Sequence, residues 1–220
     1  MKKMFIIIMI LAIIFMGMLV YRNILADAKN NISVKEIENI ESYISQIYMW
    51  KEITTEALPE FDDINKANEL WIWEVVKRNL EEYETTKEEI EQKAKEIFGE
   101  EFDKKFPKEG NQSFEYDEES GNYLATETNL NEKEDSFLLN NIEKTKEGYK
   151  VEIIEYLEDY SDKENVIIEN LQSEEIGKTN INQSDTKIQE IVKNKKERFN
   201  KKTIYLVENE DRFIVKKVEK

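Results

Sequence analysis

The segment 137–160 has the sequence FLLNNIEKTKEGYKVEIIEYLEDY, which is typical of a β-hairpin. In its second half the apolar positions move by one residue, from Val151 and Ile153 to Ile154 and Tyr156. Side chains alternate between the two faces of a strand, so this shift predicts either a β-bulge near Ile153 and Ile154 or a strand covered on both faces. The polar run TKEG supplies the turn, and we expect strands at Phe137–Lys144 and Tyr149–Tyr160.

Helical periodicity precedes this hairpin. Apolar residues three and four positions apart predict a first helix. A second helix contains the run LWIW and is apolar almost all round, which is typical of a helix buried on every side. A third has a capping box of Thr86 and Glu89 and ends at Gly99, a residue type that often terminates helices. We expect these helices at Ser33–Trp50, at Ile64–Tyr83 and between Thr86 and Gly99.

After Gly110 the apolar period falls from about 3.6 residues to about 2, which predicts strands. Residues Gln172–Asp185 are polar with little pattern, so we expect an exposed loop there. A late helix begins near Thr186 and Gln189, which form a second capping box. The remaining expected elements are this helix at Lys187–Phe199 and strands at Ser113–Asp117, Tyr123–Thr128, Val166–Leu171, Lys202–Val207 and Arg212–Val218.

The predicted order is three helices, then hairpins, then one late helix. This order is typical of an α+β domain with helices on one face of an antiparallel sheet. Three helices followed by a curved meander resemble the NTF2-like, cystatin-related cone fold over residues 33–220, with the late helix as an addition. The resemblance implies a pocket between sheet and helices, in which some enzymes of this fold use an acid and a tyrosine. The expected strands carry Tyr116, Tyr123, Tyr149 and Tyr156.

Residues Met4–Val20 form an unbroken apolar run after Lys2 and Lys3. As a helix it is about 26 Å long, close to the thickness of the hydrocarbon core of a bilayer. Because the lysines favour a cytoplasmic N-terminus, we predict a cytoplasmic stub at 1–3, a single transmembrane signal anchor at 4–25 and the domain outside a bacterial cell. The alternative is a signal peptide cleaved after Ala28, which makes the domain secreted. A pilin-like start is disfavoured, since neither a Glu near the start of the run nor a Gly before it is present.

Composition excludes several chemistries. The chain has 32 basic and 48 acidic residues, a net charge of −16, and 29 against 47, or −18, beyond residue 28. Such an acidic surface repels phosphate groups. We therefore expect no nucleic-acid partner. The sequence has no Cys and no His, which excludes a thiol nucleophile, a Ser-His-Asp triad and Cys/His zinc sites. We expect no cofactor and no metal.

Two sets of residues are candidate binding sites. Trp71 and Trp73 lie two positions apart on a helix and so point to different sides, which predicts that one faces the core and that the other faces either the core or a ligand. Within Lys193–Lys202 the only acid is Glu197, and the net charge is +5. This basic patch is either a solvated helix face, a set of partners for the protein's own carboxylates, or a site for an anionic wall polymer, lipid headgroups or an acidic envelope protein. It consists of Lys193, Lys195, Lys196, Arg198, Lys201 and Lys202.

The leading functional hypothesis is a membrane-anchored extracytoplasmic binding or assembly domain without catalysis, which contacts the lipid bilayer through residues 4–20. The alternative is a carboxylate-dependent hydrolase or isomerase that acts on cell-wall material or a small ligand. That alternative requires two acidic side chains facing a concave pocket, at least one of them with a raised pKa. A third hypothesis is a passive spacer or a sensor ectodomain.

Overall fold

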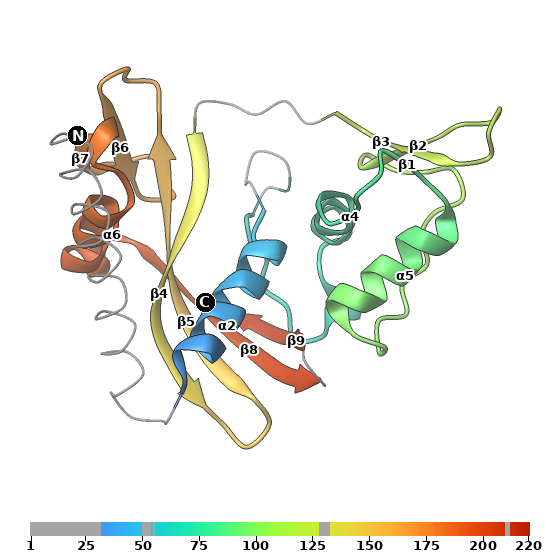
Figure 1. Ribbon diagram of the computed structural model, residues 1–220, viewed down its shortest axis with the longest axis horizontal. Helices are drawn as coiled ribbons and strands as arrows, with labels where there is room; N and C mark the ends of the chain where they lie inside the picture. Colours follow the sequence, from blue (N-terminus) through green and yellow to red (C-terminus); the bar gives the residue numbers. More distant parts are fainter. Residues whose placement is uncertain (1–31, 50–53, 55, 128–132, 210–211) are drawn as a thin grey trace, which may run out of the picture.

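The structure is a computed structural model, and it describes residues 32–49, 54, 56–127, 133–209 and 212–220 (Figure 1). The Met4–Val20 run, the anchor predicted at 4–25 and the alternative cleavage after Ala28 lie outside these residues. In the described part of the chain, no helix has both the length and the apolar character needed to cross a membrane. Every element below belongs to the domain predicted at 33–220.

The centre of the fold is the hairpin of β4 (Lys133–Lys144) and β5 (Tyr149–Asp159). Its pairing register shifts by one residue in β4, between Leu139 and Asn141, opposite Ile153 and Glu152 of β5. The extra residue of this β-bulge is therefore in β4, whereas one of the two alternatives predicted from the sequence placed a bulge in β5 itself. The prediction located the irregularity along the hairpin but assigned it to the wrong strand.

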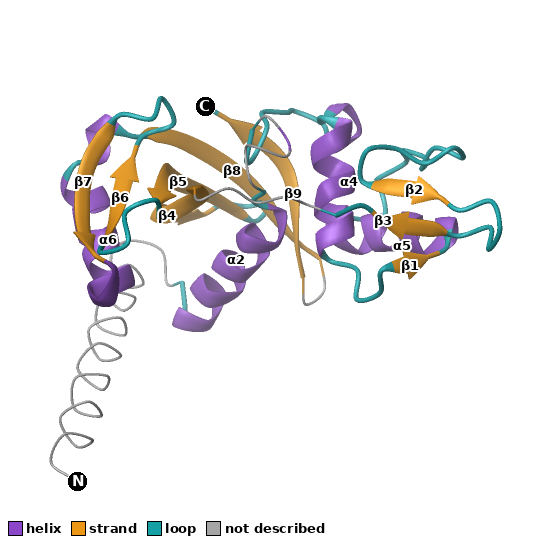
Figure 2. Cartoon of the chain, turned by 90° about the horizontal axis from the view of Figure 1, so that it is seen from above, coloured by secondary structure: helices purple, strands orange, loops and turns teal. Residues whose placement is uncertain are grey.

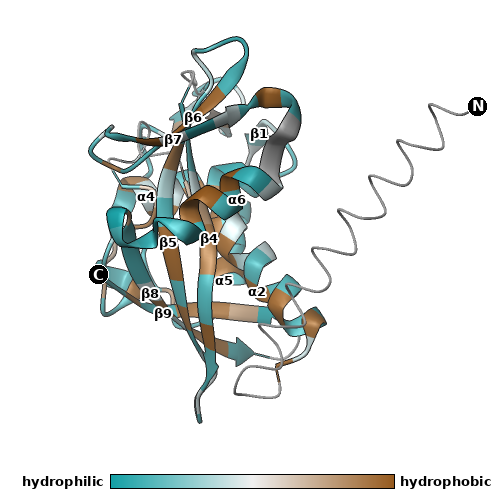
Figure 3. Ribbon diagram, turned by 90° about the vertical axis from the view of Figure 1, so that its left-hand side faces the viewer, coloured by the Kyte–Doolittle hydropathy of each residue, from teal (hydrophilic) through white to brown (hydrophobic). Residues whose placement is uncertain are grey.

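Strand β5 is also covered on both faces. Val151 and Ile153 belong to the larger of two apolar cores, and Ile154 and Tyr156 belong to the smaller one. Since neighbouring residues of a strand point to opposite faces, the two cores lie on opposite sides of the sheet. Apolar residues accordingly continue along β4 and β5 beneath the helix in front of them (Figure 3).

The main sheet divides along one edge of β5. Its strand order is β7-β6-β5-β8-β9, with β4 on the other edge of β5. Strand β8 pairs with Tyr149–Glu155 and β6 pairs with Leu157–Asp159, so the two strands share that edge and separate beside Tyr156. We call this division the fork. The strands are β6 (Asn165–Glu169), β7 (Glu175–Asn180), β8 (Asn200–Asn209) and β9 (Arg212–Glu219).

The three predicted N-terminal helices are present, and they pack into the larger core. Both α2 and α5 begin with capping boxes, Ser33 with Glu36 and Thr86 with Glu89. The second helix begins later than predicted, because Asp63 caps a separate short 3₁₀ turn at Ile64–Lys66. The helices are α2 (Val34–Ile47), α4 (Glu69–Arg78) and α5 (Lys87–Phe98).

The first predicted hairpin forms, but it does not join the main sheet. It belongs to a separate three-stranded sheet with the order β1-β3-β2, at the far end of the molecule from α6 (Figure 2). Aromatic contacts between Phe106 and both Phe114 and Tyr123 connect this sheet to the larger core. Its strands are β1 (Glu84–Thr85), β2 (Phe114–Tyr116) and β3 (Tyr123–Ala125).

The late helix, α6 (Ser184–Asn194), covers the face of the sheet opposite α2 (Figure 1). Its residues Ile188 and Val192 share the smaller core with Leu138 and Ile154. The α+β class is confirmed, whereas the expectation that helices cover only one face of the sheet is wrong. Both faces of β5 are apolar, so each requires its own helical cover.

The loop predicted at Gln172–Asp185 is also wrong, because it contains strand β7. Only Ile176 and Thr179 of this polar edge strand are buried, so the strand lacks an alternating apolar pattern. Gly177 allows α6 to lie close, since a Cβ there would stand 2.8 Å from Cγ2 of Ile191. The strand is stabilised by pairing with β6 and by the helix above it, neither of which its own sequence shows.

Candidate functional site

Two oppositely charged side chains are buried side by side at the fork. Glu155 on β5 is 1% exposed and Lys202 on β8 is 7% exposed. Charged side chains are almost never fully buried unless they are paired, so this position requires an explanation.

The strand register places both side chains on one face of the sheet. Glu155 is the last β5 residue that pairs with β8, opposite Asn200, and Lys202 lies opposite Ile153. Residues two apart on a strand share a face, so Glu155 and Lys202 both point to the side of Ile153. That side is the larger core, which α2 covers.

The ammonium of Lys202 is surrounded by acceptors. It donates a hydrogen bond to the Leu58 carbonyl, and Nζ lies 3.5 Å from Oε2 of Glu56 and 3.6 Å from Oε1 of Glu155. An ammonium has three donors and no acceptor. Lys202 therefore has two hydrogen-bond acceptors, Leu58 and Glu56, and an ion-pair contact with Glu155.

Glu155 is satisfied at one oxygen only. The Tyr48 hydroxyl, at the C-terminal end of α2, donates to Oε1 of Glu155 at 3.3 Å and also lies 3.3 Å from the Ser136 carbonyl. Oε2 of Glu155 is buried and has no hydrogen-bond partner within the described part of the chain. Leaving a buried acceptor unpaired costs about 1–3 kcal/mol, more for a charged one.

Burial shifts the proton equilibria of this cluster. It raises the pKa of the Glu155 carboxyl, and the opposing effects of the Lys202 charge and the Tyr48 hydroxyl do not cancel that rise. Burial also raises the pKa of Tyr48 well above its usual range, and the charge of Glu155 adds to the shift. Tyr48 is thus a fixed donor, while Glu155 retains a proton at higher pH than an ordinary glutamate.

The cluster lines a cavity of about 240 Å³, which we call the fork cavity. Its walls come from β4, β5 and β8, from the segment before Phe61 and from the residues that follow β6. A larger and more open depression of about 370 Å³ lies between α2, α5 and β9, but the buried Tyr43 hydroxyl there is satisfied by Ile97 and Val215. The fork cavity is lined by Glu56, Ala57, Glu60, Asp135, Glu155, Leu171, Gln172, Asn200, Lys202 and Lys220.

The tryptophans chosen from the sequence both lie in the core. Trp71 is fully buried between Phe61 and Phe98, and its indole nitrogen donates to the Ile47 carbonyl at 3.0 Å. Trp73 is 2% exposed and meets the rings of Phe102 and Phe106 edge-on. The two point to different sides of α4, as predicted, but neither lines the fork cavity.

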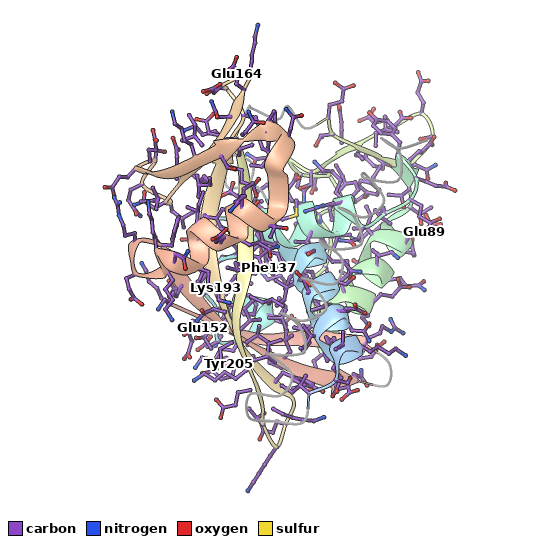
Figure 4. The ribbon with its side chains drawn as sticks, turned by 60° about the vertical axis from the view of Figure 1, so that its left-hand side comes forward. Glu89, Phe137, Glu152, Glu164, Lys193 and Tyr205 are labelled. Atoms are coloured by element: carbon purple, nitrogen blue, oxygen red, sulfur yellow. The ribbon has the colours of Figure 1, made fainter. Side chains whose placement is uncertain are left out.

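The structure divides the predicted basic patch. Lys202 is buried in the fork cluster, and Arg198 pairs with Glu174 at 2.6 Å. Lys195 donates to the Ile176 carbonyl at 2.7 Å, so its ammonium holds α6 to β7. Lys193 and Lys196 remain exposed, and Lys193 is labelled on α6 in Figure 4. Lys201 lies 3.8 Å from Glu197, at ion-pair distance.

Glu155 and Asp135 were not among the candidates predicted from the sequence, and Lys202 was predicted only as a member of the basic patch. A signal for each buried charge was present. Glu155 is the only charge in the run IIEYL, and Lys202 alternates with Ile204 and Leu206, which point inward. A charge at an inward position of a strand was therefore visible, although its partner across the sheet was not.

Comparisons with known proteins give no further guide to this site. The chain matches no family model, and no curated protein or solved structure is significantly similar to it.

Proposed function

We propose that the chain is an extracytoplasmic binding domain of a bacterial membrane, anchored by residues 4–20, and that the fork cavity is its ligand site. The observation that carries the proposal is Glu155, a buried carboxylate that lines the cavity and whose Oε2 has no hydrogen-bond partner among the residues that the structure describes. The anchor comes from the sequence alone.

The energetics of the cluster support a binding role over a purely structural one. Removing two charges from water costs several kcal/mol per ion, and apolar residues of similar volume often stabilise a fold as well or better. Stability alone therefore gives no reason to bury Glu155 beside Lys202. A ligand that completes the hydrogen bonding of Glu155 gives one.

Site-specific crosslinking in bacterial membranes tests this proposal on the full chain. A photoreactive amino acid replaces Gln172 at the mouth of the cavity, and the control carries it at Glu118 on the exposed β2–β3 turn. We expect mass spectrometry to find an adduct with an envelope component only from position 172, and externally added protease to digest the domain. Adducts of equal yield from both positions, no adduct from either, or protection from the protease would contradict the proposal.

The exposed part of the basic patch is proposed as a second contact, with an anionic wall polymer or an acidic envelope protein. Its support is charge complementarity, because Lys193 and Lys196 are exposed at one end of α6 in a strongly acidic chain. Replacing both by Glu is expected to release the membrane-extracted domain from isolated cell walls at lower salt than Glu118→Lys does. Unchanged retention would remove this contact from the proposal.

A carboxylate-dependent enzyme is the second candidate function. Its support is that Asp135 and Glu155 line the same cavity and that burial raises the pKa of Glu155, which are the two features such catalysis requires. The test compares the envelope component that is crosslinked to, or co-purified with, the wild type and the Asp135→Asn variant. If the protein is an enzyme, we expect the variant to hold the component chemically intact and the wild type to hold it cleaved or isomerised. Recovery of the same unaltered component from both proteins would exclude catalysis.

The NTF2-like family remains a proposal. It is supported by the bent antiparallel sheet and by α2, α4 and α5 in the core on one side of it. The fork and the helix on the opposite face are the features that depart from the simple cone.

A further inference from the structure

The donors and acceptors around the fork cavity are unequally used. The ammonium of Lys202 is already surrounded by oxygens of Leu58, Glu56 and Glu155, so an incoming anion would have to displace one of these contacts. The acceptors are in excess, because Oε2 of the buried Glu155 has no donor within the residues that the structure describes. What the cavity lacks is a donor.

Charge favours the same kind of ligand. Among the residues that line the fork cavity, the carboxylates outnumber the ammonium groups by four to two. Glu60 lies at the exposed rim, and Glu155 is on the buried wall. A cation that enters brings its charge toward the carboxylates while Lys202 remains neutralised by its own two glutamates.

Size restricts the ligand further. About 240 Å³ is below the range of about 300–1,000 Å³ that is usual for drug-sized ligands, so the occupant has few heavy atoms. An alkylammonium group fits this volume, carries three donors and forms the charge-assisted hydrogen bonds that a buried carboxylate accepts best.

We infer that the fork cavity binds a small alkylammonium ion, with the Glu155 carboxylate as its buried acceptor and Glu60 as a rim contact. The inference rests on the proposed function and names the ligand class of the same site. Because Oε2 of Glu155 is itself buried, binding requires the carboxylate to turn toward the cavity, while Lys202 keeps its contacts with Leu58 and Glu56. Lys220, exposed at the rim, opposes the ligand by charge repulsion.

Three probes of nearly equal length test the ligand class by calorimetric titration of the full chain in non-ionic detergent at low salt. Putrescine carries two ammonium groups, butanediol none, and succinate two carboxylates. We expect putrescine to bind with a stoichiometry of one, and the other two probes not to bind. Tighter binding of butanediol or succinate, or no binding of putrescine, overturns the inference.

Variants locate the site. Glu155→Gln is expected to weaken putrescine binding about tenfold, because it removes an ionised acceptor. Glu60→Gln, at an exposed position that does not endanger folding, is expected to weaken it about threefold and Lys220→Gln to strengthen it about threefold. The matched controls are Glu74→Gln, a buried glutamate paired with Lys77 outside the cavity, and Glu118→Gln, an exposed one. Equal effects of the cavity and control variants would show general attraction to an acidic surface and overturn the inference.

The outcomes separate this inference from the proposed function. Specific binding of succinate would mean that the cavity is a ligand site, as the proposed function requires, but that its ligand is an anion and not an alkylammonium ion. Putrescine binding that depends on Glu155, together with no adduct from position 172 in membranes, would keep the inference and overturn the proposal of an envelope partner.

Discussion

Substitution of Lys202 by methionine tests the buried ion pair most severely. Methionine keeps most of the volume of the lysine stem but removes the charge beside Glu155. At 3.6 Å, two unit charges in an effective dielectric of about 20 attract each other by about 5 kcal/mol. Desolvation of the two charges offsets much of that attraction in the wild type, and the desolvation cost of Glu155 remains when only Lys202 is removed. We therefore expect Lys202→Met to lower the free energy of unfolding by about 3–5 kcal/mol at neutral pH.

The double variant separates the ion pair from packing. Lys202→Met combined with Glu155→Met removes both charges, and Tyr48 keeps the Ser136 carbonyl as an acceptor. We expect the pair of substitutions to cost at least about 2 kcal/mol less than the two single costs added together, because no uncompensated charge remains. The control is Lys216→Met, which breaks the exposed pair with Glu101 and is expected to cost about 0.5 kcal/mol or less.

Urea unfolding followed by tryptophan fluorescence is the assay, since Trp71 and Trp73 are both buried and their emission shifts when the core opens.

The cost of Lys202→Met also depends on pH. The pKa of Glu155 is raised in the folded state, so its contribution to stability is complete below its unfolded pKa and is lost as pH rises through the folded one. Removing Lys202 raises that pKa further, so the cost is larger at neutral than at acidic pH. A cost below about 1 kcal/mol, or additive single and double variants, would refute the reasoning.

The remaining predictions concern contacts between neighbouring elements of the fold. Tyr149→Phe removes the hydrogen bond, 2.6 Å long, that contributes most to lowering the pKa of Glu36 to about 2. We expect the substitution to lower the free energy of unfolding by about 2 kcal/mol at neutral pH, measured by urea unfolding. The loss becomes smaller as pH falls from 4.5 toward 2, because protonation of Glu36 removes its contribution to stability in this range. A loss that does not depend on pH would contradict this. Gly148→Ala is expected to cost about 3 kcal/mol or more, because its Cβ would stand 2.0 Å from the Leu206 carbonyl oxygen, and wild-type stability would contradict the turn geometry. Gly177→Ala is expected to cost about 1–3 kcal/mol by pushing on Ile191, and Ile191→Ala is expected to relieve most of the added cost; purely additive costs would contradict the contact.

Much of the architecture was predictable because local signals and tertiary structure agree. The capping boxes at Ser33 and Thr86 start α2 and α5, and the TKEG turn joins β4 to β5. The shift of apolar positions in β5 predicted either a bulge or a strand with two covered faces, and the second alternative is confirmed. In each case the residues that form the contact lie within one turn or one strand of each other, so the sequence alone contains the information.

The parts that sequence reasoning missed depend on contacts between distant segments. Strand β7 is polar and is held by β6 and α6, and the bulge fell on β4 because pairing and not the β5 sequence determines its position. The candidate site has the same origin. Glu155, Lys202 and Tyr48 come from two strands and a helix end, and only the register of β5 and β8 places the two charges on one face.

The central claim is that Glu155 is a buried, incompletely satisfied acceptor that a small cation completes. The most direct test is a carbon NMR titration of the Glu155 carboxyl in the full chain, assigned with Glu155→Gln, with and without putrescine. The account predicts a pKa above 4.5 in the free protein and a lower one when putrescine is bound, because a bound positive charge favours the ionised carboxylate. A pKa at or below 4.5, or one that putrescine leaves unchanged, would contradict it.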